Sequence, residues 1–534
     1  MKEIGLRLHS LNLKGQLIKW RLALLIFTLV YAVLLLLYLG SMSVQWDEAT
    51  HLNTGIMMLH GDFSSYLNEG PFYPPLYDLM TAGFFRIAGI SLFNARLVSV
   101  VFAILNIWML FEFVRTMYGL KVALISSVLL AIMPGFVWLS RLSMIETVLL
   151  FFFSISMLLF FSWLRTNRTR YVVLSGIALG LGFLAKYQAI VGVLVIAVVL
   201  LALAREHVKA KILTFLLLIL LVAAFAIPWF FITFQVYSTQ TLNQWLYALQ
   251  MGNPQKSVYS LQFPAPVFYL VAMTWPYGTY GFAPVSIFIY MFALIGLGLF
   301  GWRRKLEDKF LLVWFFSVLI FFTLIGNKDW RYIVGVFPVL AIAAASLMVF
   351  AYDKLVGPTK TVFSSARKKV KGRFGTVLLL TLISFSIGWN CVDTTLWMAY
   401  KNQRSLPVEE STNYASRMLG QNESILVVGP FNMLSGDIVK FYLQANQRQN
   451  QVWQYPEQPI DTYQPDFNIT ELINLCRQNN SKYLLISDEE SSFPLFNTTM
   501  TMHTIYDSLS DSGRFKFEKS FGSSPYRIYL LSFA

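Results

Sequence analysis

The chain has 534 residues, of which 56% are hydrophobic and only 13% are charged. Because soluble domains carry about 25% charged residues, this composition excludes an ordinary soluble protein and indicates lipid as the main solvent. The net charge of +14 resembles that of a nucleic-acid-binding protein, but the basic residues follow a membrane topology, so we exclude nucleic acid as a partner. Two cysteines, Cys391 and Cys476, are too few for a disulfide framework.

Apolar runs long enough to cross a bilayer recur along the first 400 residues, and each predicts a transmembrane helix. They lie at 20–41, 94–115, 121–138, 143–163, 171–185, 188–204, 211–236, 283–301, 310–325, 332–351 and 375–397. The fold class predicted is therefore a polytopic α-helical membrane protein with about 11 transmembrane helices. The first run is too long for a cleaved signal peptide and lacks a small-residue cleavage site, so we expect it to remain as an anchor.

The basic residues set the expected orientation. With residues 1–19 as a cytoplasmic tail, the inner segments before residue 398 hold 24 Lys and Arg residues, and the outer segments hold 7. Cytoplasmic loops carry the excess of Lys and Arg, so this orientation is favoured. It places a first outer loop (42–93), a second long outer loop (237–282) and residues 399–534 outside the cytoplasm. The plasma (inner) membrane is the expected location.

Residues 399–534 differ in character from the rest and predict a soluble extracytoplasmic α/β domain. The short apolar runs "SILVVGP" and "KYLLISDEE" predict buried strands, and "TELINLCRQNN" between them predicts an amphipathic helix. The final "YRIYLLSFA" predicts another strand. No Gly-rich phosphate loop follows "ILVVGP", so a dinucleotide-binding site is excluded.

The few charges at the outer edge of the membrane domain are the candidate functional residues, because a charge at membrane depth is costly and usually functional. Carboxylates occur after the first span and at the outer end of the fourth, and cations occur nearby on the same side. These residues are Asp47, Glu48, Glu146, Arg96, Arg141, Lys186 and Arg331.

Each of these residues also has a structural interpretation. Lys186 and Arg141 fit cations that reach toward lipid headgroups, and the Asp47–Glu48 pair fits the start of a short helix, "DEATHLNTG". His51, four residues after Asp47, would share its helical face and fits an interfacial histidine equally well. A divalent metal held by Asp47, Glu48 and Glu146 stays open. Taken together, the cations suit a phosphate leaving group and a carboxylate suits activation of a hydroxyl nucleophile.

Six segments resemble, in order, those of the GT-C membrane glycosyltransferases, in particular the branch of protein O-mannosyltransferases and lipid A aminoarabinose transferases. The segments are "QWDEATHL", "FYPPLY", "NARLVSVVFAIL", "SRLSMIETVLLFFF", "GLGFLAKYQAIVG" and "DWRYIVGVFPVLAI". The resemblance covers about residues 20–350. The resemblance implies a GT-C catalytic domain over 20–398.

The resemblance also implies roles for particular residues. Asp47 is the expected catalytic base, with Glu48 as its partner, and Glu146 stands where the family usually has Asp. Lys186, Arg331 and Tyr332 are expected to meet the donor phosphate, and we add Arg141 and Arg96, the other cations at this edge, to that set. Tyr73 precedes Pro74 where the family usually has Lys, which removes one expected phosphate contact; Tyr73 and His51 are candidate acceptor or loop residues.

The resulting expectation is an inverting glycosyltransferase that moves a sugar from a polyprenyl-phosphate donor to a hydroxyl of a protein, lipid or glycan acceptor outside the cytoplasm. No cofactor is required by this chemistry. The alternatives are a transporter of lipid-linked sugars and a non-catalytic scaffold. Transporters place polar sites near the bilayer midplane in repeated halves, whereas these charges lie at helix ends and no repeat is visible.

Overall fold

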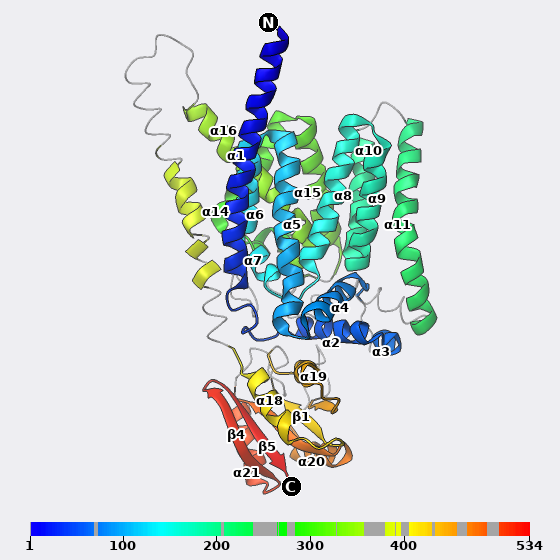
Figure 1. Cartoon of the computed structure of the whole chain (residues 1–534), viewed down its shortest axis with the longest axis vertical. Helices are drawn as coiled ribbons and strands as arrows, with labels where there is room; N and C mark the ends of the chain where they lie inside the picture. The colour runs from blue at the N-terminus through cyan, green and yellow to red at the C-terminus, as the bar shows by residue number, and fades with distance from the viewer. Residues whose placement is uncertain are drawn as a thin grey trace.

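The structure is a computed structural model that describes residues 2–68, 73–203, 208–238, 264, 266–274, 283–326, 328–356, 377, 380–389, 391–392, 394–396, 405–429, 433–456, 467–488 and 501–534. A helical bundle forms one part and a small α/β domain lies at one end of it, with the N-terminus at the opposite end (Figure 1). Most of the predicted second outer loop lies outside the described residues, and so does most of the basic segment 354–373.

Helices coincide with each predicted span between residues 20 and 351. They are α1 (Lys2–Leu36), α5 (Leu92–Tyr118), α6 (Leu120–Ala131), α7 (Pro134–Ser140), α8 (Glu146–Thr166), α9 (Thr169–Ala185), η1 (Tyr187–Ile190), α10 (Val191–Leu203), α11 (Val208–Tyr237), α14 (Ile287–Arg303), α15 (Leu306–Leu324), η3 (Trp330–Val336) and α16 (Phe337–Val356). A further short helix, α13 (Phe268–Ala272), lies within the predicted second outer loop. In the part of the chain that is described, five helices are long and apolar enough to cross a membrane, or six with a bent pair counted as one span. The predicted number of about 11 is therefore not established. The last predicted span, 375–397, is described only in part.

The predicted span 121–138 is not a continuous helix. α6 ends at Ala131 and α7 begins at Pro134, with a bend of 65° between them. Proline disfavours the helical conformation of the residue before it, and Met133 is accordingly extended, with φ −62° and ψ 125°. The bend directs the end of α7 toward the loop at residues 141–145 that precedes α8.

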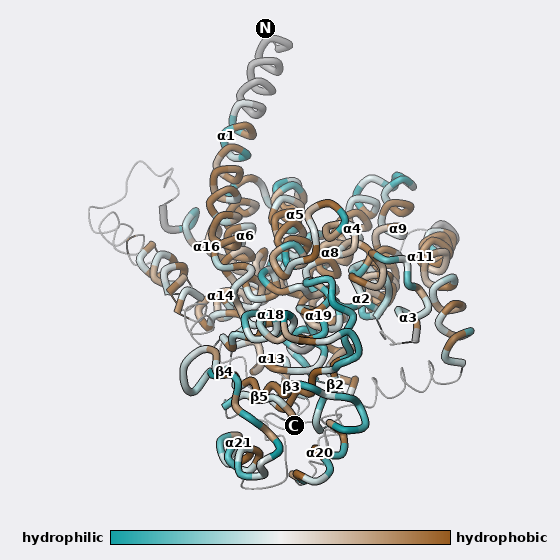
Figure 2. Tube along the Cα trace, turned by 60° about the horizontal axis from the view of Figure 1, so that its bottom comes forward, coloured by the Kyte–Doolittle hydropathy of each residue, from teal (hydrophilic) through white to brown (hydrophobic). Residues whose placement is uncertain are grey.

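The outer surface of the bundle is apolar, as a lipid-facing surface requires. Leu220 on α11 and Ile295 on α14 are 65% and 57% exposed, and these helices are mostly hydrophobic along their length (Figure 2). Inside, α14 and α16 approach closely, because a Cβ on Gly296 would collide with the carbonyl of Ala343. Small residues permit such close contacts between membrane helices.

Three helices of the first outer loop cover one end of the bundle. They are α2 (Trp46–His60), α3 (Phe63–Asn68) and α4 (Leu76–Ala88), and α2 and α3 run across the bundle end rather than along its axis (Figure 1). α2 includes the short helix that "DEATHLNTG" predicts. Glu48 accepts a hydrogen bond from the backbone N–H of Gln45 (3.1 Å), which satisfies one of the free donors at the helix start. The loop thus presents Asp47 and Glu48 at the edge of the bundle.

The C-terminal domain is a five-stranded mixed sheet with helices. Its elements are α18 (Val408–Met418), β1 (Ser424–Val428), α19 (Gly436–Ala445), β2 (Val452–Gln454), α20 (Ile469–Gln478), β3 (Ser481–Ser487), α21 (Met502–Asp511), β4 (Phe515–Ser523) and β5 (Tyr526–Phe533). The strand order is β2-β1-β3-β5-β4. β1 is parallel to β2 and β3, and β5 is antiparallel to β3 and β4. The three predicted strands and the predicted helix α20 are all present.

The C-terminal domain packs against the first outer loop. Leu52 and Ile56 of α2 share a buried cluster with Leu434 and Ile438 of the C-terminal domain. The side chain of Asn53 donates a hydrogen bond to the carbonyl of Asp437 (2.9 Å). α2 is therefore held between the helical bundle on one side and α19 on the other (Figure 1).

Candidate active site

Asp47 and Glu48 begin α2, but their side chains lie in different surroundings. Successive residues of an α-helix are about 100° apart around its axis, so the two carboxylates face different neighbours. Glu48 is completely buried, whereas the side chain of Asp47 is 43% exposed. We call their surroundings the Glu48 cluster (Glu48, Arg96, Gln45 and Ser143) and the Asp47 cluster (Asp47, Arg331, Asp329, Lys186, Glu146, Tyr73 and Tyr332).

In the Glu48 cluster every oxygen of the carboxylate accepts two hydrogen bonds. One oxygen accepts from Arg96 Nε (2.6 Å) and from the backbone N–H of Ser143 (2.6 Å). The other accepts from Arg96 Nη2 (2.7 Å) and from the backbone N–H of Gln45 (3.1 Å). This bidentate pair is of the strong, geometrically specific kind. It ties the start of α2 to α5 and to the loop before α8.

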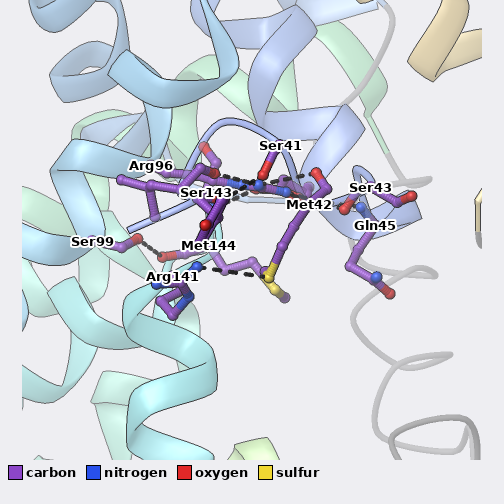
Figure 3. Close-up of polar contacts among 12 residues, drawn as sticks. Ser41, Met42, Ser43, Gln45, Arg96, Ser99, Arg141, Ser143 and Met144 are labelled. Carbon is purple, nitrogen blue, oxygen red and sulfur yellow. Dashed lines mark hydrogen bonds and ion pairs between the residues drawn. The ribbon is translucent and has the colours of Figure 1, made fainter. Parts of the chain in front are cut away.

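Arg96 also holds the segment that leads into α2. Its guanidinium donates to the carbonyls of Leu39 (2.7 Å), Met42 (3.1 Å) and Ser43 (3.1 Å), and the contacts of Arg96 with this segment are drawn in Figure 3. A buried guanidinium needs acceptors for all its donors, and this one has them. Arg96 is therefore a positioning residue for the turn before Asp47.

Arg141 plays a similar part at the end of α1. It donates to the carbonyls of Leu34 (3.1 Å), Leu35 (2.7 Å) and Leu37 (2.7 Å). These carbonyls lie at or beyond the helix end, where helical partners are missing. Figure 3 draws Arg141 beside Met42, with a contact to its sulfur (3.9 Å). Arg141 is 1% exposed, so it does not reach toward lipid headgroups.

These contacts differ from three of the predicted roles. The carboxylate of Glu48 accepts from four donors, the guanidinium of Arg96 donates to Glu48 and to backbone carbonyls, and Nη1 and Nη2 of Arg141 donate to backbone carbonyls. None of the three side chains is open to a substrate in this arrangement, because all three are buried. The structure instead gives Glu48, Arg96 and Arg141 the task of positioning the loops that carry Asp47 and Glu146.

The Asp47 cluster is more open and combines five segments of the chain, namely α2, the residues before α4, the start of α8, the end of α9 and the start of η3. Arg331, at the start of η3, donates from Nη1 to Asp47 (2.6 Å). Its Nε and Nη2 meet the carboxylate of Asp329 at 2.9 and 2.7 Å. Arg331 is thus held between two carboxylates, one from the first outer loop and one from its own segment.

Lys328 fixes the segment that carries Asp329 and Arg331. Its amine is buried and donates to the carbonyls of Phe322 (2.8 Å), Thr323 (2.7 Å) and Ile325 at the end of α15. Cations near a helix C-terminus are favoured by the free carbonyls there. Lys328 therefore anchors the segment that leads into η3 to the end of α15.

The other half of the Asp47 cluster is the pair of Lys186 and Glu146. Lys186 Nζ donates to Glu146 Oε1 at 2.9 Å, and the lysine lies over the ring of Tyr332, 5.7 Å from its centroid. Lys186 comes directly after α9, and Glu146 is the first residue of α8, so both are presented at helix ends. The second oxygen of Glu146 has no hydrogen-bond partner among the described residues.

The charges of this cluster act on Asp47 together. Burial favours the neutral carboxyl, but the charge and hydrogen bond of Arg331 and the charge of Lys186 outweigh this and hold the pKa of Asp47 below its ordinary value. Asp47 is therefore a carboxylate at neutral pH. The same site is close enough to Tyr73 that the charges of Asp47, Arg331 and Glu146 act on its hydroxyl, while burial raises the pKa of Tyr73. Its phenol thus stays neutral.

His51 lies behind Asp47 and is paired with a buried carboxylate. Its Nδ1 is 2.9 Å from Asp78 Oδ1, and the other oxygen of Asp78 accepts from the hydroxyl of Tyr66 (3.2 Å). The ring of Tyr73 packs on His51, with centroids 5.1 Å apart. His51 is 2% exposed, so it is a buried residue of the loop and not an interfacial one.

Asp47, Glu48 and Glu146 do not form a metal-ligating set. Among the described residues no three His, Cys, Asp or Glu side chains are grouped so that they could hold a metal ion. Glu48 is turned toward Arg96, and one oxygen of Glu146 is used by Lys186. The three carboxylates therefore do not share a coordination site in this arrangement.

Two residues of the site, Asp329 and Asp78, were not assigned roles from the sequence. Asp329 precedes Arg331 by two residues in "KDWRY", a spacing that allows a local pair with its guanidinium. Asp78 follows "FYPPLY" as the only charge in an apolar stretch, and a carboxylate in such a stretch predicts a buried partner. The partner itself, His51, is 27 residues away.

The comparisons with known proteins agree with this architecture. The dolichyl-phosphate-mannose-protein mannosyltransferase family matches residues 73–231. An undecaprenyl phosphate-alpha-4-amino-4-deoxy-L-arabinose arabinosyl transferase of Serratia proteamaculans is 26% identical over 220 residues. That alignment covers 40% of this chain and 37% of the relative.

Solved structures show the same fold over nearly the whole chain. ArnT from Cupriavidus metallidurans in the apo state has a TM-score of 0.61 at 13% identity, with 95% of this chain and 97% of that chain covered. The Archaeoglobus fulgidus oligosaccharyltransferase has a TM-score of 0.54 at 13% identity, with 87% and 69% covered. The family match over residues 73–231 and the arabinosyl transferase relative make part of the chain similar to membrane glycosyltransferases, and the solved structures share its fold.

Proposed function

We propose that this protein transfers a sugar from a polyprenyl-phosphate donor to an acceptor hydroxyl on the extracytoplasmic face of the membrane, with inversion at the anomeric carbon. The observation that carries the proposal is the Asp47 cluster. It combines a half-exposed carboxylate with two cations, Arg331 and Lys186, at the end of an apolar bundle. This is the boundary at which a lipid-linked phosphosugar would present its reacting bond.

The proposed reaction needs a base on the acceptor side and positive charge on the leaving side. Asp47 takes the acceptor proton as the hydroxyl oxygen attacks the anomeric carbon. Arg331 and Lys186 receive the phosphate as the bond to the sugar breaks, with the electron pair remaining on the phosphate oxygen. A phosphate leaves readily without protonation, so a second acid is not needed, in contrast to glycoside hydrolysis.

The donor phosphate must compete for cations that already have carboxylate partners. Arg331 is paired with Asp47 and Asp329, and Lys186 with Glu146. A phosphate oxygen is at least as good an acceptor for these groups. When the phosphate takes over Arg331, Asp47 loses its closest positive charge and becomes a stronger base. Tyr332, whose ring lies under Lys186, borders the same place.

The relatives support this reaction class and do not favour the transporter alternative. One structure of ArnT is bound to undecaprenyl phosphate, with a TM-score of 0.61, and one of the archaeal oligosaccharyltransferase is in complex with an inhibitory peptide and a dolichol-phosphate. We infer a donor of the same chemical class here. The acceptor class proposed is a protein, lipid or cell-envelope glycan that carries a free hydroxyl.

The test is turnover by the purified protein in detergent or nanodiscs. It is incubated with a panel of polyprenyl-phosphate sugars that vary in sugar and chain length, and released polyprenyl phosphate is identified by mass spectrometry. Release from at least one donor, abolished in Asp47→Asn, supports the proposal. Release from no donor, or undiminished release by Asp47→Asn, contradicts it.

A further inference from the structure

The Asp78–His51 pair is a polar structure that the proposed reaction does not yet use. Both side chains are buried, at 0% and 2% exposure, although they lie in a loop at the edge of the bundle. Burying a carboxylate and an imidazole costs free energy that a simple apolar contact would avoid. The pair is completed by Tyr66, so each oxygen of Asp78 has a partner.

The pair leaves one nitrogen of His51 unused. Asp78 accepts a hydrogen bond, so Nδ1 of the neutral imidazole carries the proton and Nε2 carries the lone pair. Nε2 has no hydrogen-bond partner among the residues that the structure describes. The arrangement is that of an imidazole held in one tautomer by a carboxylate, as in proton-transferring Asp–His pairs.

His51 is also close to Asp47. The two residues are four positions apart on α2, which places their Cβ atoms about 5–6 Å apart on one helical face. When His51 is protonated, it is close enough for its charge to lower the pKa of the Asp47 carboxyl. Tyr73 packs on the ring of His51, and burial and the charge of Asp47 raise the pKa of the Tyr73 hydroxyl. The side chains of His51 and Asp47 therefore start from the same face of α2.

We propose that His51 is a second proton acceptor, which takes the acceptor's proton from Asp47 and is held for this task by Asp78. The proposal rests on the proposed function. In it, the O–H bond of the acceptor breaks as the bond from oxygen to the anomeric carbon forms, and the proton goes to Asp47. The proton then passes to His51 Nε2 and leaves with solvent as product departs, which returns His51 to its neutral form.

Two features make such a transfer favourable. Once the phosphate has left and Arg331 pairs with Asp47 again, Arg331 and Lys186 hold the pKa of that carboxyl low, so a protonated Asp47 gives up its proton readily. The carboxylate of Asp78 stabilises the positive charge that His51 then carries.

The experiment compares His51→Ala with His60→Gln, a histidine at the exposed end of the same helix. Steady-state rates are measured on the full-length protein with whichever donor the wild type turns over. We expect kcat of His51→Ala to fall roughly 10- to 100-fold. This loss is smaller than or equal to the smallest loss expected when a direct catalytic base is removed, which is about 100-fold. The donor KM should stay within about twofold of the wild type. His60→Gln should keep the wild-type kcat.

Chemical rescue separates proton transfer from packing. Imidazole added to His51→Ala should restore much of kcat, whereas pyrazole, which has the same shape and is a far weaker base, should not. An unchanged kcat in His51→Ala, or equal rescue by both compounds, overturns the proposal. If His51→Ala does not fold, His51→Gln takes its place: a wild-type kcat overturns the proposal, and a similar loss with an unchanged melting temperature supports it.

The two proposals fail in different ways. No turnover by the wild-type protein would count against the glycosyltransferase reaction itself. Turnover that is lost in Asp47→Asn but kept in His51→Ala would leave that reaction standing and remove only the role of His51.

Discussion

Asp47 and Glu48 are neighbours in the chain and chemically alike, yet their surroundings give them opposite uses. Glu48 accepts four hydrogen bonds and has no exposed surface. Asp47 forms an ion pair with Arg331 and keeps 43% of its side chain exposed. A carboxylate whose oxygens all accept hydrogen bonds from the protein stabilises structure, whereas one that is partly open can exchange partners with a substrate.

The same contrast extends to the arginines of the two clusters. Arg96 donates to three carbonyls of the segment before α2 as well as to Glu48. Arg331 donates to the carboxylates of Asp47 and Asp329. A carbonyl is fixed in the backbone, but a carboxylate side chain can move aside for a phosphate. The Glu48 cluster thus holds the backbone around it in place, whereas the partners of Arg331 in the Asp47 cluster are side chains that can move.

The largest effect should come from Asp47→Asn. This change keeps the size of the side chain but removes the base, so we expect the rate of polyprenyl phosphate release to fall about 10²- to 10⁴-fold. The melting temperature in detergent should stay near that of the wild type, since Asp47 is partly exposed. A rate within threefold of the wild type would show that the base is a different residue.

Glu48→Gln should act mainly on stability. It leaves the buried guanidinium of Arg96 without its counter-charge, which costs about 3–5 kcal/mol for a buried pair. The measurement is chemical denaturation in detergent. Glu112→Gln is the matched control, because Glu112 pairs with Arg21 and Arg115 but is 30% exposed, and exposed pairs contribute about 0–1 kcal/mol. Equal losses in the two variants would contradict the distinction between the clusters.

Lys186→Ala should weaken binding of the donor phosphate. Loss of one hydrogen bond to a charged group corresponds to roughly a tenfold lower affinity, measured with polyprenyl phosphate itself. Lys121→Ala serves as the control, since Lys121 pairs with Asp353 in an exposed position. If Lys186→Ala reduced the affinities for donor and acceptor equally, the phosphate role of Lys186 would be wrong.

The smallest expected effect is on the stability of the folded protein at low pH. The pKa of Asp47 is lower in the folded protein than the ordinary value of about 4 for an unfolded chain. Its contribution to stability is therefore fully present above the unfolded value and is lost as the pH falls through the folded value. The melting temperature of Asp47→Asn should decline less steeply than that of the wild type below about pH 4. Parallel curves would indicate that the pair with Arg331 does not form in solution.

The sequence predicted many of the helices and strands that the structure describes, but it did not predict which charged side chains pair with one another. Long apolar runs and alternating patterns are local signals, so the spans, the strands β1, β3 and β5, and the helix α20 were predicted. The bend before Pro134 was missed because the apolar run continues through it. β2, with three residues, is too short to give a pattern.

Partner choice depends on distances between segments far apart in the chain. Nothing in "QWDEATHL" indicates that Glu48 pairs with Arg96 and that Asp47 pairs with Arg331. Arg96 and Arg141 were expected to meet phosphate because they are cations at the correct edge of the membrane. Their actual acceptors are backbone carbonyls at the end of α1 and in the following turn, which no sequence pattern marks.

The pair of Asp47 and Arg331 also has a consequence for biosynthesis. Its two residues are 284 positions apart, so the ribosome completes α1 and α2 long before it adds η3. During that interval Glu48 can already meet Arg96, whereas Asp47 has no guanidinium to pair with. Glu48 thus gains its arginine partner early in translation and Asp47 gains its own late, so a chain that stops before residue 331 would contain Asp47 without the guanidinium that pairs with it.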